Sequence, residues 1–163
     1  MLRGYSFGFH IDGLHKFSTF GQSNCGGDIN GDGINDIIIC SAGFTSQIRE
    51  NSGACTIIFG SKEILKSVHN SKFDIINMDT SVGFHVLGLE GDYLGASYGC
   101  DRIGDINGDG IDDVVFSSML SNHEGNGRLY ILYGRSTQEW QDSLFMLRLT
   151  LFGIKYRVLS HTR

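Results

Sequence analysis

The sequence predicts an all-β protein built from two copies of one unit. The first observation is a ten-residue segment that occurs twice, at residues 27–36 and 104–113, and differs only at Asn35 and Asp112. The second is that a short run of β-branched and aromatic residues follows each copy, as is typical of buried strands. The third is the presence of 23 glycines among 163 residues, which suits a chain with many tight turns.

The repetition continues on both sides of the ten-residue segment. Residues 8–13 match residues 83–88, and residues 53–60 match residues 127–134. Small changes in the spacing of the matched residues belong in connecting loops, where insertions cost little. A fixed period with several short strands in each unit is typical of a propeller or a similar array.

Each ten-residue segment places side-chain oxygen atoms at alternate positions. Three carboxylates and one amide around a single point suit Ca²⁺, which takes six to eight oxygen ligands with loose geometry. The seventh loop position would add its main-chain carbonyl. The predicted ligands of two Ca²⁺ ions are Asp28, Asn30, Asp32, Ile34 and Asp36 in the first loop, and Asp105, Asn107, Asp109, Ile111 and Asp113 in the second. Metal-free turns and a catalytic metal are the alternatives.

The residues that follow each loop exclude an EF-hand. The twelfth loop position, where an EF-hand needs a bidentate Glu, holds Ile39 in one copy and Phe116 in the other. Each loop runs directly into an apolar strand and not into a helix. We therefore expect a β-hairpin, with Gly33 and Gly110 providing the backbone freedom at the bend.

The unit resembles a known family. Phe20-Gly21, the loop that follows, and a strand ending in Cys40-Ser41-Ala42 are similar to the FG-GAP repeat of integrin α-chain propellers. The second copy ends its strand in Phe116-Ser117-Ser118, and neither copy has the Gly-Ala-Pro of the family. The resemblance covers roughly residues 8–134. It implies that each repeat forms a four-stranded blade of a larger propeller and binds Ca²⁺ in its hairpin loop.

The matched units divide the chain into four parts. Residues 1–7 form a lead-in, residues 8–82 the first repeat, residues 83–152 the second, and residues 153–163 the start of a truncated third repeat. Closed propellers have about four to eight blades, so two blades cannot close a ring. We therefore expect further blades in a longer protein, or self-association through exposed blade edges.

The cysteines show no paired spacing of the zinc type. We expect free, buried thiols that fill the core. A Cys25–Cys40 or a Cys40–Cys55 bridge is the alternative. The four residues concerned are Cys25, Cys40, Cys55 and Cys100.

The sequence does not predict an enzyme. The six histidines lack the paired spacing of a catalytic metal motif, and no Gly-x-Ser-x-Gly elbow occurs. His10 and His85 occupy matching positions in the two units, which favours a structural role.

Charge and hydropathy exclude two classes of partner. The net charge is −5, and seven acidic residues lie in the two loops, with no basic stripe for nucleic acid. No apolar run approaches the ~20 residues of a membrane span, and residues 1–7 lack the apolar core of a signal peptide. The resemblance implies an extracellular or cell-surface location.

The resemblance also implies a function. It indicates a calcium-binding propeller segment that acts in cell adhesion or ligand binding, with a protein or glycan partner and with Ca²⁺ in a structural role. One alternative is the accessory repeat region of a secreted enzyme, of phospholipase or hydrolase type, whose catalytic domain lies outside this chain. Another is a truncated fragment without function.

Overall fold

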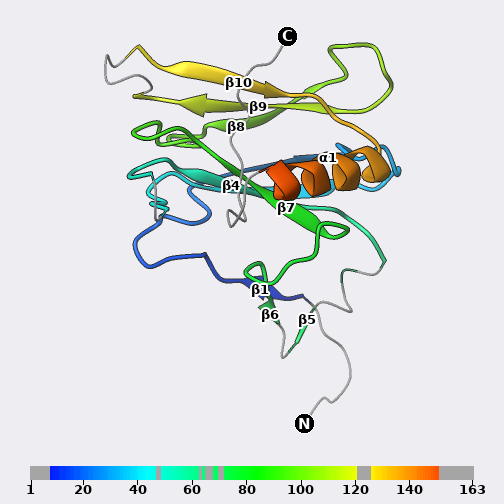
Figure 1. Cartoon of the computed structure of the whole chain (residues 1–163), viewed down its shortest axis with the longest axis horizontal. Helices are drawn as coiled ribbons and strands as arrows, with labels where there is room; N and C mark the ends of the chain where they lie inside the picture. The colour runs from blue at the N-terminus through cyan, green and yellow to red at the C-terminus, as the bar shows by residue number, and fades with distance from the viewer. Residues whose placement is uncertain are drawn as a thin grey trace.

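The computed structural model describes residues 8–46, 49–62, 64, 68–69, 72–120 and 126–150. These residues form short strands in three sheets and one helix (Figure 1). The predicted all-β class is confirmed, and the sheets do not close into a ring, as expected of part of a propeller. The predicted lead-in and the predicted start of a third repeat lie outside the described residues.

The largest sheet has four antiparallel strands in the order β2-β3-β4-β7, and we call it the first blade. Its strands are β2 (Ser23–Gly27), β3 (Asp36–Ser41), β4 (Ala54–Ile58) and β7 (Gly83–Leu87). Along β3, Ile38 is fully buried while Ile37 is 37% exposed, because successive side chains point to opposite faces. Strand β7 comes from the start of the second sequence repeat, so sheet and repeat are offset by one strand.

The second sheet is antiparallel in the order β10-β9-β8. Its strands are β8 (Cys100–Gly104), β9 (Asp113–Ser118) and β10 (Arg128–Leu132). The pairing of β8 with β9 shifts register between Arg102 and Gly104. Within the described residues no fourth strand pairs with the outer edge of β10.

A third, small sheet was not predicted. It has the order β1-β6-β5, with β1 (His10–Ile11) parallel to β6 (Lys72–Phe73) and β5 (Val68–His69) antiparallel to it. Phe73 and Ile75 from this region pack against Ile58 of the first blade. The small sheet therefore covers one face of the first blade.

The main core lies between the first blade and the second sheet, which Figure 1 shows at mid-height and at the top. The first blade contributes Ile38, Cys55, Ile57 and Phe84, among others. The second sheet contributes Cys100, Val114, Phe116 and Leu132. Both sides are apolar, so this packing is the main hydrophobic stabilisation of the described residues.

The one helix of the described residues, α1 (Thr137–Thr150), falls within the predicted second repeat. Its N-terminus is a capping box, in which Ser136 Oγ accepts a hydrogen bond from the Glu139 N–H and the Glu139 carboxylate accepts one from the Ser136 N–H. Trp140 is buried against Phe84 and donates its indole N–H to the Ile29 carbonyl at 3.2 Å. No described helix has the length and apolar character needed to cross a membrane.

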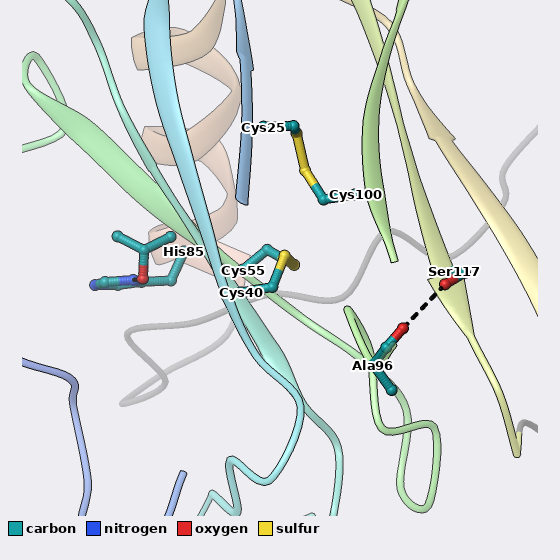
Figure 2. The surroundings of a disulfide bond; sticks show 8 residues. Cys25, Cys40, Cys55, His85, Ala96, Cys100 and Ser117 are labelled. Atoms are coloured by element: carbon teal, nitrogen blue, oxygen red, sulfur yellow. Dashed lines mark hydrogen bonds between the residues drawn. A yellow bond between two sulfur atoms is a disulfide. The ribbon is translucent and has the colours of Figure 1, made fainter. Parts of the chain in front are cut away.

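The expectation of free thiols is wrong, because all four cysteines form disulfides (Figure 2). Cys40 and Cys55 are direct cross-strand partners in β3 and β4 and form one disulfide. The alternative of a Cys40–Cys55 bridge is therefore confirmed. Cys25 of β2 bonds to Cys100 of β8, across the two sheets. The second bridge depends on how two distant units pack, which cysteine spacing does not reveal.

Candidate metal centre

Each ten-residue segment closes a β-hairpin, as predicted. The first loop joins β2 to β3, where Gly27 pairs with Asp36, and the second joins β8 to β9, where Gly104 pairs with Asp113. The bends require positive φ, which glycine adopts without strain: 84° at Gly33 and 88° at Gly110.

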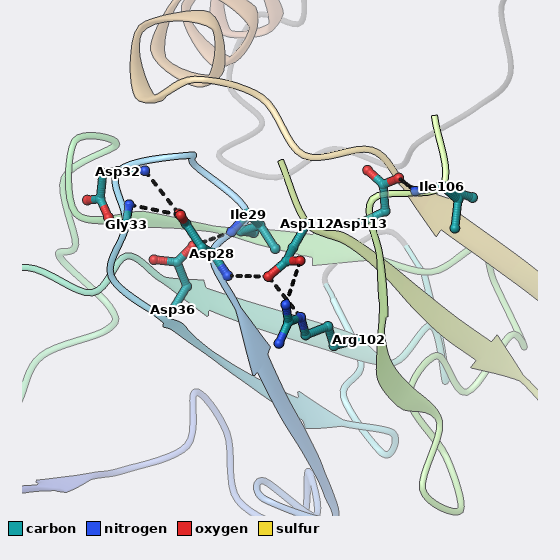
Figure 3. A network of polar contacts seen from close by, with 9 residues as sticks. All are labelled: Asp28, Ile29, Asp32, Gly33, Asp36, Arg102, Ile106, Asp112 and Asp113. Carbon is teal, nitrogen blue, oxygen red and sulfur yellow. Dashed lines mark hydrogen bonds and ion pairs between the residues drawn. The ribbon is translucent and has the colours of Figure 1, made fainter. Parts of the chain in front are cut away.

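The first half of the first loop gathers side-chain oxygen atoms around one backbone amide. The Asp32 N–H donates both to Asp28 Oδ1 at 3.0 Å and to Asn30 Oδ1 at 3.1 Å. The other oxygen of Asp28 accepts the Gly33 N–H at 2.8 Å, as Figure 3 shows. Asn30 in turn donates its side-chain amide to Asp32 at 3.2 Å. Asp28, Asn30 and Asp32 are therefore linked to one another by hydrogen bonds within the loop.

The second loop repeats this arrangement. The Asp109 N–H donates to Asp105 Oδ1 and to Asn107 Oδ1, both at 3.1 Å. Asp105 also accepts the N–H groups of Gly108 and Gly110, at 2.7 and 2.8 Å. The hydrogen bond from Gly110 contributes most to lowering the pKa of Asp105 below its usual value. Asp105 is therefore an exposed carboxylate in its charged form.

The last carboxylate of each loop has a different environment. Asp36 is buried, and its two oxygens accept the N–H groups of Ile29 at 2.9 Å and Gly60 at 2.8 Å. Asp113 is buried too and accepts the N–H groups of Ile106 and Gly134, both at 2.8 Å. These two residues tie each loop to the chain just after β4 or β10.

Burial has an electrostatic consequence at Asp36. The loss of hydration raises the pKa of its carboxyl group to about 7, although the hydrogen bonds from Gly60 and Ile29 act in the opposite direction. The negative charges of Asp32 and Asp28 add to the increase. A cation held in the loop would favour the ionised form of Asp36.

The donor set fits a hard cation in residue type and spacing. Carboxylate, amide and main-chain oxygens are the ligands that Ca²⁺ prefers. In the described part of the chain, however, no three His, Cys, Asp or Glu side chains gather closely enough to hold a metal ion. Instead of a metal ion, backbone N–H groups donate hydrogen bonds to the loop carboxylates. Calcium binding by the ten ligand residues therefore stays a prediction.

Sequence reasoning did not find the contact between the two loops. Asp112 forms an ion pair with Arg102 at 2.8 Å and accepts the Asp28 N–H at 2.9 Å (Figure 3). The Asp112 N–H in turn donates to the Asp28 carbonyl at 3.1 Å. The sequence does mark Asp112, because it stands at the one position where the two ten-residue segments differ.

The matching histidines lie in different settings. His85 of β7 contacts Thr56 Oγ1 at 3.0 Å and the Ile75 carbonyl at 3.1 Å, which agrees with a structural role. His10 lies in the small sheet and is exposed. The fold gives these two matched residues no common site.

Comparison with known proteins identifies the class. The FG-GAP repeat model matches residues 20–54 and 103–132, which contain the two loops and their strands. With the blade and hairpin loops described above, this defines an FG-GAP repeat protein that forms part of a propeller.

Two known proteins are similar to this chain over most of its length. The chain is 31% identical over 157 residues to the phosphatidylinositol-glycan-specific phospholipase D of Dictyostelium discoideum. It is 30% identical over 156 residues to integrin alpha-4 of Xenopus laevis. These matches cover 90% and 89% of this chain but 16% and 13% of the relatives, so the chain spans less than a fifth of their length.

Proposed function

We propose that this chain is a calcium-stiffened FG-GAP segment that presents a binding surface outside the cell. The observation that carries the proposal is the duplicated loop, in which Asp, Asn and Asp converge in the same way in both repeats. Ca²⁺ would be held by the predicted ligands of each loop and would neutralise their clustered charge. The chain itself would catalyse no reaction.

The role of calcium would be structural. Each loop joins the first two strands of its sheet and is tied to the chain after the third, so a bound ion would fix three strands together. An ion that binds only the folded state stabilises it by about 2.7 kcal/mol at a concentration a hundred times its dissociation constant.

The disulfides support an extracellular location. Structural disulfides persist in oxidising compartments and are rare in the cytosol. This chain has two of them, one within the first blade and one between the two sheets. The similarity to integrin alpha-4 supports the same location and a protein or glycan ligand.

A binding experiment tests this function. The immobilised protein is probed with a panel of matrix proteins and with a glycan array, in calcium and in EDTA. We expect at least one ligand whose binding is lost in EDTA. If no ligand binds a protein shown to be folded and loaded with calcium, the adhesion function is contradicted.

A second candidate is an accessory region of a secreted enzyme. The similarity to a phospholipase D over 90% of this chain favours it. A catalytic domain encoded in the same reading frame would support this alternative, whereas further FG-GAP repeats and an export signal would support the adhesion module.

A further inference from the structure

The two loops have nearly the same sequence but different surroundings. Ile29, at the second position of the first loop, is 1% exposed, whereas its counterpart Ile106 in the second loop is 51% exposed. Within their own loops the two residues are equivalent, because their N–H groups donate to the matching carboxylates of Asp36 and Asp113. Their exposure therefore differs because of what packs against each loop from outside.

The segment that begins helix α1 bonds to the first loop. The Ile29 carbonyl accepts two hydrogen bonds, from the Arg135 N–H at 3.0 Å and from the Trp140 indole N–H at 3.2 Å. Trp140 is buried, and its ring also packs against Phe84 of the first blade. The start of α1 is therefore fixed to the backbone of the first loop.

The second loop also contacts the first half of the first loop. Asp112 accepts the Asp28 N–H at 2.9 Å, and its own N–H donates to the Asp28 carbonyl at 3.1 Å (Figure 3). The Ile111 side chain lies against Gly31, where an added β-carbon would come within 3.1 Å of it. Residues 28–31 are thus held by α1 and by the second loop together.

The matching half of the second loop lacks this support in the part of the chain that the structure describes. There, no hydrogen bond from outside the loop reaches the backbone of residues 105–108. Gly108 is the counterpart of Gly31, and a β-carbon added to it would meet no described atom within 4 Å. The first half of the second loop is therefore held mainly by bonds within the loop.

This difference matters for binding an ion. A loop that outside contacts already hold in one conformation loses less conformational entropy on binding than a loop that is ordered at that moment. The supported residues 28–31 include two predicted ligands, Asp28 and Asn30, whereas their counterparts Asp105 and Asn107 lie in the unsupported half. The first loop therefore starts with the lower cost.

We propose that Trp140 of α1 positions the first loop, which is ordered without calcium and is the tighter of the two calcium sites. Trp140 acts through the Ile29 carbonyl and does not touch the ion. The order of affinities rests on the calcium binding proposed above. The order of the first loop without calcium does not rest on it, so separate experiments test the two parts.

Hydrogen exchange in EDTA tests the loop without calcium. The amides of Asp32 and Asp109 are a matched pair, because each follows Asn-Gly and donates to the same two partners within its loop. We expect the Asp32 amide to exchange at least ~10-fold more slowly than the Asp109 amide. Equal rates in the natural chain overturn the proposal.

Trp140→Phe tests the role of the indole, since it removes the N–H donor and keeps an aromatic ring beside Phe84. We expect the exchange of the Asp32 amide to become about fivefold faster, the effect of one hydrogen bond. Gln138→Ala, an exposed position on the same helix, is the control and keeps the slow rate. An unchanged rate in Trp140→Phe rules out Trp140 as the positioning residue. If this variant does not fold, the two amides of the natural chain still decide the proposal.

Tryptophan fluorescence reports the first site in a calcium titration. Trp140 is the one tryptophan of the chain and bonds to the first loop, whereas calorimetry counts both sites. We expect the fluorescence to change with the first equivalent of calcium, and calorimetry to give two dissociation constants at least ~10-fold apart. Equal constants, or a fluorescence change that follows the second equivalent, contradict the order of affinities.

Two further variants separate the sites. Asp109→Ala leaves the first loop and Asp32→Ala leaves the second, and Trp140→Phe is added to each. We expect Trp140→Phe to weaken calcium binding about fivefold at the first loop and not at the second. Equal weakening at both would show that Trp140 only stabilises the whole fold. A folded natural chain without calcium binding contradicts the proposed function and the order of affinities, while the exchange in EDTA still decides whether α1 orders the first loop.

Discussion

The single difference between the two ten-residue segments determines how the loops contact each other. Asp112 bonds through both carboxylate oxygens to Arg102 and also to the backbone of Asp28 in the other loop. Its counterpart Asn35 carries no charge and could not form the ion pair. A near-perfect repeat therefore contains one residue that distinguishes its two copies.

Asp112→Asn tests this contact. The substitution keeps the size of the side chain but removes its charge. Asp112 is 13% exposed and Arg102 is 53% exposed, so solvent weakens the ion pair and we expect the free energy of unfolding to fall by about 1 kcal/mol. Urea denaturation measures the change, and Asp101→Asn on the same sheet is the control. Equal stability of Asp112→Asn and the natural chain would contradict the contact.

His85 makes stability depend on pH. Burial lowers its pKa from the usual 6.5, and the hydrogen bond to the Ile75 carbonyl opposes this only in part. The carbonyl can only accept, so Nε2 carries the proton and neutral Nδ1 accepts from Thr56. The folded state therefore favours neutral His85.

Through His85, a lower pH destabilises the folded chain. Near pH 6.5 and below, His85 becomes protonated in the unfolded chain but stays neutral in the folded chain. Its contribution to the free energy of unfolding therefore falls as the pH is lowered from about 7.5 to about 5.5. Denaturation of the natural chain and of His85→Gln at both pH values isolates the effect, because other groups titrate in both proteins. An identical pH dependence of the two proteins would show that His85 titrates normally.

At the level of elements, the start of the helix has a signal in the sequence. Ser136 and Glu139 have the spacing of a capping box and form its two hydrogen bonds. We expect Ser136→Ala to lower the free energy of unfolding by about 1 kcal/mol and to reduce helical circular dichroism. Thr137→Ala, one residue later, is the control. No effect of Ser136→Ala would mean that the packing of Trp140 alone fixes the helix.

The strands that could be predicted from the sequence are those with a local pattern of polar and apolar residues. The hairpins around the loops follow from alternate polar residues, a glycine at the bend and an apolar run such as residues 37–40. The small β1-β6-β5 sheet could not be predicted, because its two-residue strands are too short for any periodicity. The different environment of Asp36 and Asp113 was also hidden, since it depends on Gly60 and Gly134, which follow later strands.

At the level of the whole molecule, two disulfides fix different parts of the fold. The Cys25–Cys100 bridge closes a separation of 75 residues and joins the two sheets, whereas the Cys40–Cys55 bridge closes 15 residues within one sheet. Loop-closure entropy gives about 4.5 kcal/mol for the first and about 3 kcal/mol for the second.

Paired Cys→Ala substitutions test this order. We expect Cys25→Ala/Cys100→Ala to lower the free energy of unfolding more than Cys40→Ala/Cys55→Ala, because the longer loop is released. Each variant serves as the comparison for the other in urea denaturation. The reverse order would show that packing around the buried Cys40 and Cys55 outweighs chain entropy.

We propose that both loops bind calcium and that binding stabilises the fold. Calorimetric titration with Ca²⁺ measures the stoichiometry, using the natural chain, Asp32→Ala, Asp109→Ala and the control Asp101→Ala. We predict two sites in the natural chain and in the control, one site in each loop variant, and a higher melting temperature with calcium than with chelator. A folded natural chain that binds no calcium would contradict calcium binding by the two loops.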